Sequence, residues 1–123
     1  MLTRKAFEKL VSEAVSALPE EFLSHLDNVE IVVEDFPSLE VQQSEGLDSP
    51  YDLLGYYEGV PLTEREGPPA GWLPDRITVY QKPLEAICHS RAELYEEIQT
   101  TVVHEVAHFF GIDEDRISEL GWE

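Results

Sequence analysis

The feature that most constrains this chain is a helical pattern at residues 91–110, which is long for a chain of 123 residues. Ser90 and Glu93 have the spacing of a capping box, which marks the start of a helix. Gly111 stands where a left-handed residue often ends one. Apolar residues recur on one helical face, at Leu94, Ile98, Val102 and Phe109. Twenty helical residues extend roughly 30 Å, so the pattern predicts a helix that spans the whole domain.

Short helices and strands are predicted around this long helix. A helical stripe at residues 3–17, with Thr3 as N-cap, and a second helix opened by Pro19 are expected at the N-terminus. Runs of β-branched and aromatic residues predict three strands, at residues 29–33, 53–60 and 76–81. The polar segment 38–50 and the Pro/Gly-rich segment 61–75 are interpreted as loops, and residues 113–120 as a short closing helix. This order predicts an α+β fold, with a small mixed β-sheet packed on helices.

Composition limits the classes of function. Residues 1–123 are predicted to form a single domain, because 42% of them are hydrophobic and the chain is too short to divide into two cores. With 8 Lys+Arg against 26 Asp+Glu, the net charge is -18, which argues against nucleic-acid and membrane-surface partners. Cys88 is the only cysteine, so no internal disulfide can form. Neither a signal sequence nor a membrane-spanning run is recognised, and we expect a soluble cytoplasmic protein.

The segment HEVAH at residues 104–108 carries the chemistry of the predicted helix. His104 and His108 are one helical turn apart, so both imidazoles can reach one metal ion. Glu105 is rotated about 100° from His104 and can take a proton from a water molecule activated by that ion. The pattern therefore predicts a zinc site for metal-assisted hydrolysis, with Glu105 as the general base.

A catalytic zinc site usually has a third protein ligand. Gly111, three residues after His108, can take a positive φ and reverse the chain. Three residues further on is Glu114, our first candidate for the third ligand, and Asp113 or Asp115 could replace it if the turn differs. Glu119 and Glu123 are further candidates with less chain to reach back.

The apolar neighbours of the motif also favour a metal. His104 and His108 stand among valine, alanine and phenylalanine residues at positions 102–110, so a helix without a metal ion would have to bury both imidazoles beside Glu105. Buried imidazoles without a metal or another partner would cost several kcal/mol.

Four stretches of the chain together resemble a known family: VEIVVEDFPS, LLGYYEGVPLTERE, LPDRITVYQKPLEAIC and TTVVHEVAHFFGIDEDRISELGW. They are similar in order to the minimal zincin-like metallopeptidases, small bacterial proteins built around H-E-x-x-H-x-x-G-x-x-[DE], and the similarity covers residues 28–123. The resemblance implies a small sheet over an active-site helix near the C-terminus. It also implies zinc held by His104, His108 and Glu114, with Glu105 as general base. The larger metzincins have a methionine in a turn beneath the metal, whereas Met1 is the only methionine here.

The predicted function is that of a zinc-dependent metallopeptidase, a hydrolase. The alternatives are a catalytically silent metal-binding or regulatory module and a metal-dependent RNA hydrolase, which the charge of -18 opposes. A peptide or protein substrate is expected to lie along an exposed sheet edge, supplied by LLGYYEGV or RITVYQ. Acidic surroundings would favour basic peptides. A hydroxyl of Tyr56 or Tyr57 could serve an oxyanion, although packing is the commoner role of a strand tyrosine.

Overall fold

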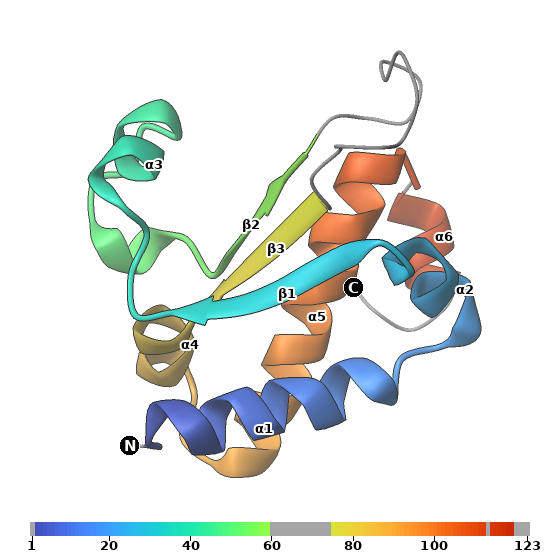
Figure 1. The fold of residues 1–123 in the computed structure, drawn as a ribbon, viewed down its shortest axis with the longest axis horizontal. Coiled ribbons are helices and arrows are strands. Elements are labelled where there is room, and N and C mark those ends of the chain that lie inside the picture. Colours follow the sequence, from blue (N-terminus) through green and yellow to red (C-terminus); the bar gives the residue numbers. More distant parts are fainter. Residues whose placement is uncertain (1, 60–74, 113, 120–123) are drawn as a thin grey trace.

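A computed structural model describes residues 2–59, 75–112 and 114–119 and has the expected α+β architecture (Figure 1). The described helices are α1 (Arg4–Ser16), α2 (Glu20–Leu23), α3 (Leu39–Ser44), α4 (Gln81–Ile87), α5 (Arg91–Phe110) and α6 (Glu114–Glu119). The strands are β1 (Val29–Glu34), β2 (Gly55–Glu58) and β3 (Asp75–Tyr80). Two 3₁₀ turns, η1 (Ser24–Leu26) and η2 (Pro50–Asp52), precede β1 and β2. No helix in these ranges is long and apolar enough to cross a membrane.

The three described strands form one mixed sheet in the order β1-β3-β2. β1 runs parallel to β3, with Val29 opposite Asp75, and β2 runs antiparallel to β3, with Gly55 opposite Val79. β3 is buried at five of its six positions, as a central strand should be. Of the two segments expected to offer an edge to a substrate, therefore, LLGYYEGV contains the edge strand and RITVYQ does not.

The core lies between the sheet and two helices. α5 packs against β2 and β3, and α1 crosses the N-terminal half of α5 (Figure 1). Gln99 on α5 is buried and donates its side-chain amide to the Ala14 carbonyl on α1, at 2.8 Å. The apolar face of α5 is fully buried at Leu94, Ile98, Val102, Val103 and Val106. Burial of this face holds the long helix in place, because helix stability in proteins comes mostly from packing.

The expected loop at residues 38–50 was wrong, because it contains α3. Ser38 caps this helix by accepting a hydrogen bond from the Val41 N–H at 3.2 Å. None of its six residues is buried, so the helix leaves no apolar periodicity in the sequence.

The sequence analysis also missed the helix α4. Its N-cap, Tyr80, makes no side-chain capping bond, so no capping signal marks its start. The expected loop at 61–75 lies outside the described residues except for Asp75, which begins β3.

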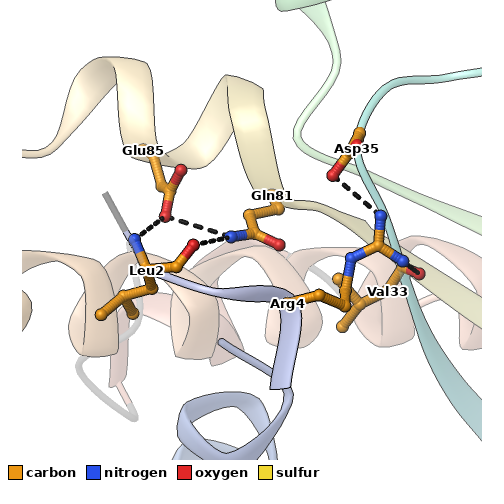
Figure 2. A network of polar contacts seen from close by, with 6 residues as sticks. All are labelled: Leu2, Arg4, Val33, Asp35, Gln81 and Glu85. Atoms are coloured by element: carbon orange, nitrogen blue, oxygen red, sulfur yellow. Dashed lines mark hydrogen bonds and ion pairs between the residues drawn. The ribbon is translucent and has the colours of Figure 1, made fainter. Parts of the chain in front are cut away.

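Polar contacts fasten the N-terminus to α4 and β1 (Figure 2). The Leu2 N–H donates to a Glu85 carboxylate oxygen at 3.0 Å, and Gln81 Nε2 donates to the Leu2 carbonyl at 2.9 Å. Gln81 Nε2 also lies 3.2 Å from the same Glu85 oxygen. At the end of β1, Arg4 donates to the Val33 carbonyl and to Asp35. The segment before α1 is therefore part of the folded unit.

Candidate metal centre

α5 places both histidines of the HEVAH segment one turn apart near its C-terminal end. Ser90 begins the helix by accepting a hydrogen bond from the Glu93 N–H at 3.1 Å, as expected. The Glu93 carboxylate accepts from the His89 N–H, so it reaches one residue beyond the N-cap itself. His104 and His108 are exposed, so the argument that a metal is needed to offset the cost of burying them does not apply. The apolar neighbours Val103, Val106 and Ala107 turn toward the core, whereas both histidines lie on the solvent-exposed side of the helix.

The Glu105 side chain on α5 is half-buried beside the edge strand β2. Burial raises the pKa of its carboxyl above the ordinary glutamate value. A hydrogen bond from the Tyr57 backbone N–H and the nearby imidazoles of His108 and His104 oppose this shift, whereas the Glu45 carboxylate adds to it. A carboxyl with a raised pKa is a stronger proton acceptor when ionised, which suits a general base.

The register of the sheet explains why the Tyr57 N–H is available to Glu105. The Tyr80 N–H donates to the Leu54 carbonyl, so Leu54 and Tyr80 form a hydrogen-bonded pair. Gly55 and Tyr57, at the alternate positions, therefore direct their backbone groups away from β3. The Glu105 carboxylate therefore reaches from α5 to a backbone N–H on the outer edge of β2.

Two cavities open on either side of Glu105 along α5. One has a volume of about 350 Å³ and is lined by His104, Glu105 and residues earlier on the helix. The other, of about 420 Å³, is lined by Glu105, His108 and residues of β2. Leu53 and Gly55 line both. The predicted base is accordingly accessible from two sides, and each side holds one of the two histidines.

Gly55 allows β2 to approach α5 at this point. A Cβ at Gly55 would lie 2.6 Å from the Thr101 methyl carbon and 3.6 Å from Glu105 Cγ. A distance of 2.6 Å is too short for two carbon atoms, so a side chain at this position would push the strand and helix apart. Glycine here sets the narrow spacing in which Tyr57 can reach Glu105.

The chain turns after α5 as the sequence predicted. Gly111 has φ of 71° and ψ of 27°, and the N–H groups of Gly111 and Ile112 both bond to the Ala107 carbonyl. α6 then begins at Glu114, whose side chain lies outside the described part of the structure, as does Asp113. Asp115 and Glu119 are exposed, and neither joins the two histidines in a metal-binding group.

The donor set fits zinc in its chemistry. Two solvent-accessible imidazoles at one-turn spacing are the type of ligand that zinc prefers, and the neighbouring carboxylate is held back by β2. Within residues 2–59, 75–112 and 114–119, no three His, Cys, Asp or Glu side chains with described positions gather as a metal site. The third ligand thus stays a prediction.

Several residues around the motif were not foreseen from the sequence. Glu97 and Thr101 lie on the motif's side of α5, two turns and one turn before the motif respectively, so helical spacing alone could have identified them. Glu45 comes from the end of α3, far from the motif in the chain, and no local pattern connects it to His108.

Comparison with known proteins agrees with this geometry. Residues 26–122 match the family described as zincin-like metallopeptidase. Among solved structures, the chain resembles a conserved hypothetical protein from Thermo thermophilus, with 25% sequence identity and a TM-score of 0.50. That match covers 86% of this chain and 92% of the other. No protein with a curated description matches. Since the family match includes the whole sheet, α5 and the HEVAH segment, the chain belongs to the zincin-like metallopeptidase family.

Proposed function

We propose that the protein is a zinc-dependent peptidase in which Glu105 is the general base. The observation that carries this proposal is the setting of Glu105, which is half-buried, bonded to the edge strand and reached by two cavities that each contain a histidine. A glutamate that only stabilises the fold does not have to be accessible to substrate or water, whereas Glu105 is reached by both cavities. Membership of the zincin-like metallopeptidase family supports the same reaction class.

In this proposal His104 and His108 hold the ion, with Glu114 as the third ligand. A bound zinc ion supplies Lewis acidity for the attack of water on a peptide carbonyl. The Glu105 carboxylate accepts the proton from that water and later delivers it to the leaving amine nitrogen. The Tyr57 N–H keeps the carboxylate oriented, and the burial that raises its pKa increases its basicity. The cleaved peptide would lie along the outer edge of β2, where Gly55 directs its backbone outward.

The test starts with the metal and proceeds to cleavage. Zinc content is measured by elemental analysis on the wild type, His108→Ala and Glu114→Ala, with His89→Ala as the matched control, since His89 is exposed and lies before α5. We expect one zinc per wild-type and control chain, none for His108→Ala and weakened binding for Glu114→Ala. An increase in Tm with added zinc gives a second readout that does not depend on activity.

Cleavage of a peptide library by the zinc-loaded protein then distinguishes the three functional hypotheses: a peptidase, a silent metal-binding module and an RNA hydrolase. We expect Glu105→Gln to retain zinc and lose cleavage, and chelation to abolish the activity of the wild type. Zinc binding without cleavage would favour the silent metal-binding module. Cleavage of RNA with a steep salt dependence would favour the RNA hydrolase. A Glu105→Gln variant as active as the wild type would refute the mechanism.

A further inference from the structure

Each cavity beside Glu105 contains one additional carboxylate. Glu97 lines the cavity that holds His104, and Glu45 lines the cavity that holds His108. Within the described part of the chain, neither carboxylate forms an ion pair with a basic side chain. No lysine or arginine is among the described residues that line the two cavities. Both cavities therefore combine an open approach with an unpaired negative charge.

The cavity of Glu97 has the shape and chemistry for a long cationic side chain. Glu97 stands seven residues before His104 on α5, a separation of roughly 10 Å along the helix axis. Between them the cavity is bounded by Leu53 and Leu54 on one side and by the hydroxyl-bearing face of α5 on the other. Lysine and arginine carry their charge at the end of a stem of several methylenes, which can pack on leucine while the charge reaches a carboxylate. Glu97 is only half-exposed, so a charge that pairs with it is partly shielded from water.

The cavity of Glu45 lies on the other side of the base. Glu45 is the C-cap of α3, and its carboxylate is close enough to raise the pKa of Glu105. The cavity wall opposite is formed by Tyr56 and Tyr57 of β2. A carboxylate in an open cavity that no described lysine or arginine lines attracts a positively charged group. Glu45 is exposed, and we expect its selectivity to be weaker than that of Glu97.

We infer that Glu97 and Glu45 are specificity-determining residues, which select peptides with a basic side chain on either side of the cleaved bond. The inference rests on the proposed function for the location of the bond at Glu105. Each side of the bond is assigned to a different carboxylate, because one cavity extends from Glu105 toward the start of α5 and the other toward His108. Loss of one carboxylate should therefore change the preference on one side of the bond and leave the other side unchanged.

The experiment compares cleavage of matched peptides by the zinc-loaded, full-length protein. The peptides differ only in one residue on one side of the bond, which is Lys, Gln or Glu. The variants are Glu97→Gln, Glu45→Gln and Glu97→Lys, with Glu96→Gln as the control, because Glu96 is exposed on α5 and lines neither cavity. A thermal melt of each variant confirms that it is folded.

For the wild type and Glu96→Gln, we expect kcat/KM to be about fivefold higher for the Lys peptide than for the Gln peptide, when that residue faces Glu97. A fivefold ratio corresponds to the strongest stabilisation usual for a solvent-accessible ion pair. Glu97→Gln should remove this preference, and Glu97→Lys should shift it toward Glu. Glu45→Gln should instead reduce the preference on the opposite side of the bond. Cleavage by the wild type without preference for Lys, or a preference that survives both Gln substitutions, would overturn the inference while the peptidase function stands.

Failure of the proposed function is detected separately by binding. A fluorescent Lys peptide is titrated into zinc-loaded Glu105→Gln, alone and combined with Glu97→Gln. If the wild type cleaves nothing but the Lys peptide binds more weakly once Glu97 is changed, the cavity selects cations and the peptidase assignment fails. If the Lys peptide is neither cleaved nor bound more tightly than the Glu peptide, the inference fails as well.

Discussion

Substitution of Gly55 by alanine tests the packing that forms the candidate site. The new methyl group would lie 2.6 Å from the Thr101 methyl carbon and 3.4 Å from the Thr78 carbonyl oxygen. Thr101 is buried and β-branched on a helix, so its side chain has few alternative rotamers. Overpacking of this kind costs about 1–3 kcal/mol. Gly55 does not have a positive φ, so alanine also gains about 0.5 kcal/mol by restricting the unfolded chain.

We therefore expect Gly55→Ala to lower the free energy of unfolding by about 1.5 kcal/mol. For a chain of this size, Tm should fall by about 6 °C. The assay is thermal and urea unfolding of the metal-free protein, followed by peptide cleavage after zinc loading. Cleavage should fall by more than stability explains, because the strand that moves carries the Tyr57 N–H that orients Glu105.

Thr101→Ser provides the decisive comparison, because it removes only the methyl group that the new side chain would meet. In the double variant the two changes should compensate by about 1 kcal/mol relative to the sum of the single variants. If Gly55→Ala is as stable as the wild type, β2 and α5 are not as close as described. If it is destabilised but Thr101→Ser gives no compensation, the strain lies elsewhere and the reasoning fails.

Three further predictions concern single side chains. Gly111→Ala should lower stability by about 1–2 kcal/mol in urea unfolding, because an L-residue would have to adopt the φ of 71°; no change would exclude the left-handed turn. Glu85→Leu should cost about 2 kcal/mol, because the Leu2 N–H and Gln81 Nε2 lose a buried acceptor, and a stabilised variant would contradict this account. Glu105→Gln should be more stable than the metal-free wild type at neutral pH. Because the pKa of Glu105 is raised in the folded protein, the wild type gains stability as the pH falls through that pKa. The difference in stability between Glu105→Gln and the wild type should therefore vanish by about pH 4. Urea midpoints measured across pH test this, and a difference that stays constant with pH would show that the pKa is not raised.

Local signals were sufficient to predict the element that carries the site. Ser90 and Gly111 fixed both ends of α5, and the apolar stripe fixed the face that is buried. These features act within one or two helical turns, which is the range that a sequence pattern can represent. The same reasoning misjudged the two histidines, because apolar neighbours in sequence do not surround a residue on a helix. They occupy the opposite face and leave His104 and His108 exposed.

The surroundings of the motif depend on tertiary contacts that no local pattern records. The approach of Gly55 to Thr101 joins a strand to a helix that lies far away in the chain. Glu45 reaches the site from α3, a helix with no buried residue and hence no periodic signal. α4 contains Pro83, a residue that usually interrupts helices, yet here it lies in the first turn, where a missing N–H costs nothing. Sequence alone therefore predicted that Glu105 and the two histidines share the last turns of α5, but not what surrounds them.

The contacts between the N-terminal segment and the last third of the chain also have a consequence for the order of folding. Leu2 bonds to Glu85 and Ala14 to Gln99, partners that are 83 and 85 residues apart in sequence. Such contacts close long loops before they contribute stability, so they slow folding. During synthesis, α1 is made before α5, and the part of its apolar face that packs on α5 stays uncovered until α5 is complete. The histidine-bearing helix consequently gains its packed setting only when these two distant segments of the chain have met.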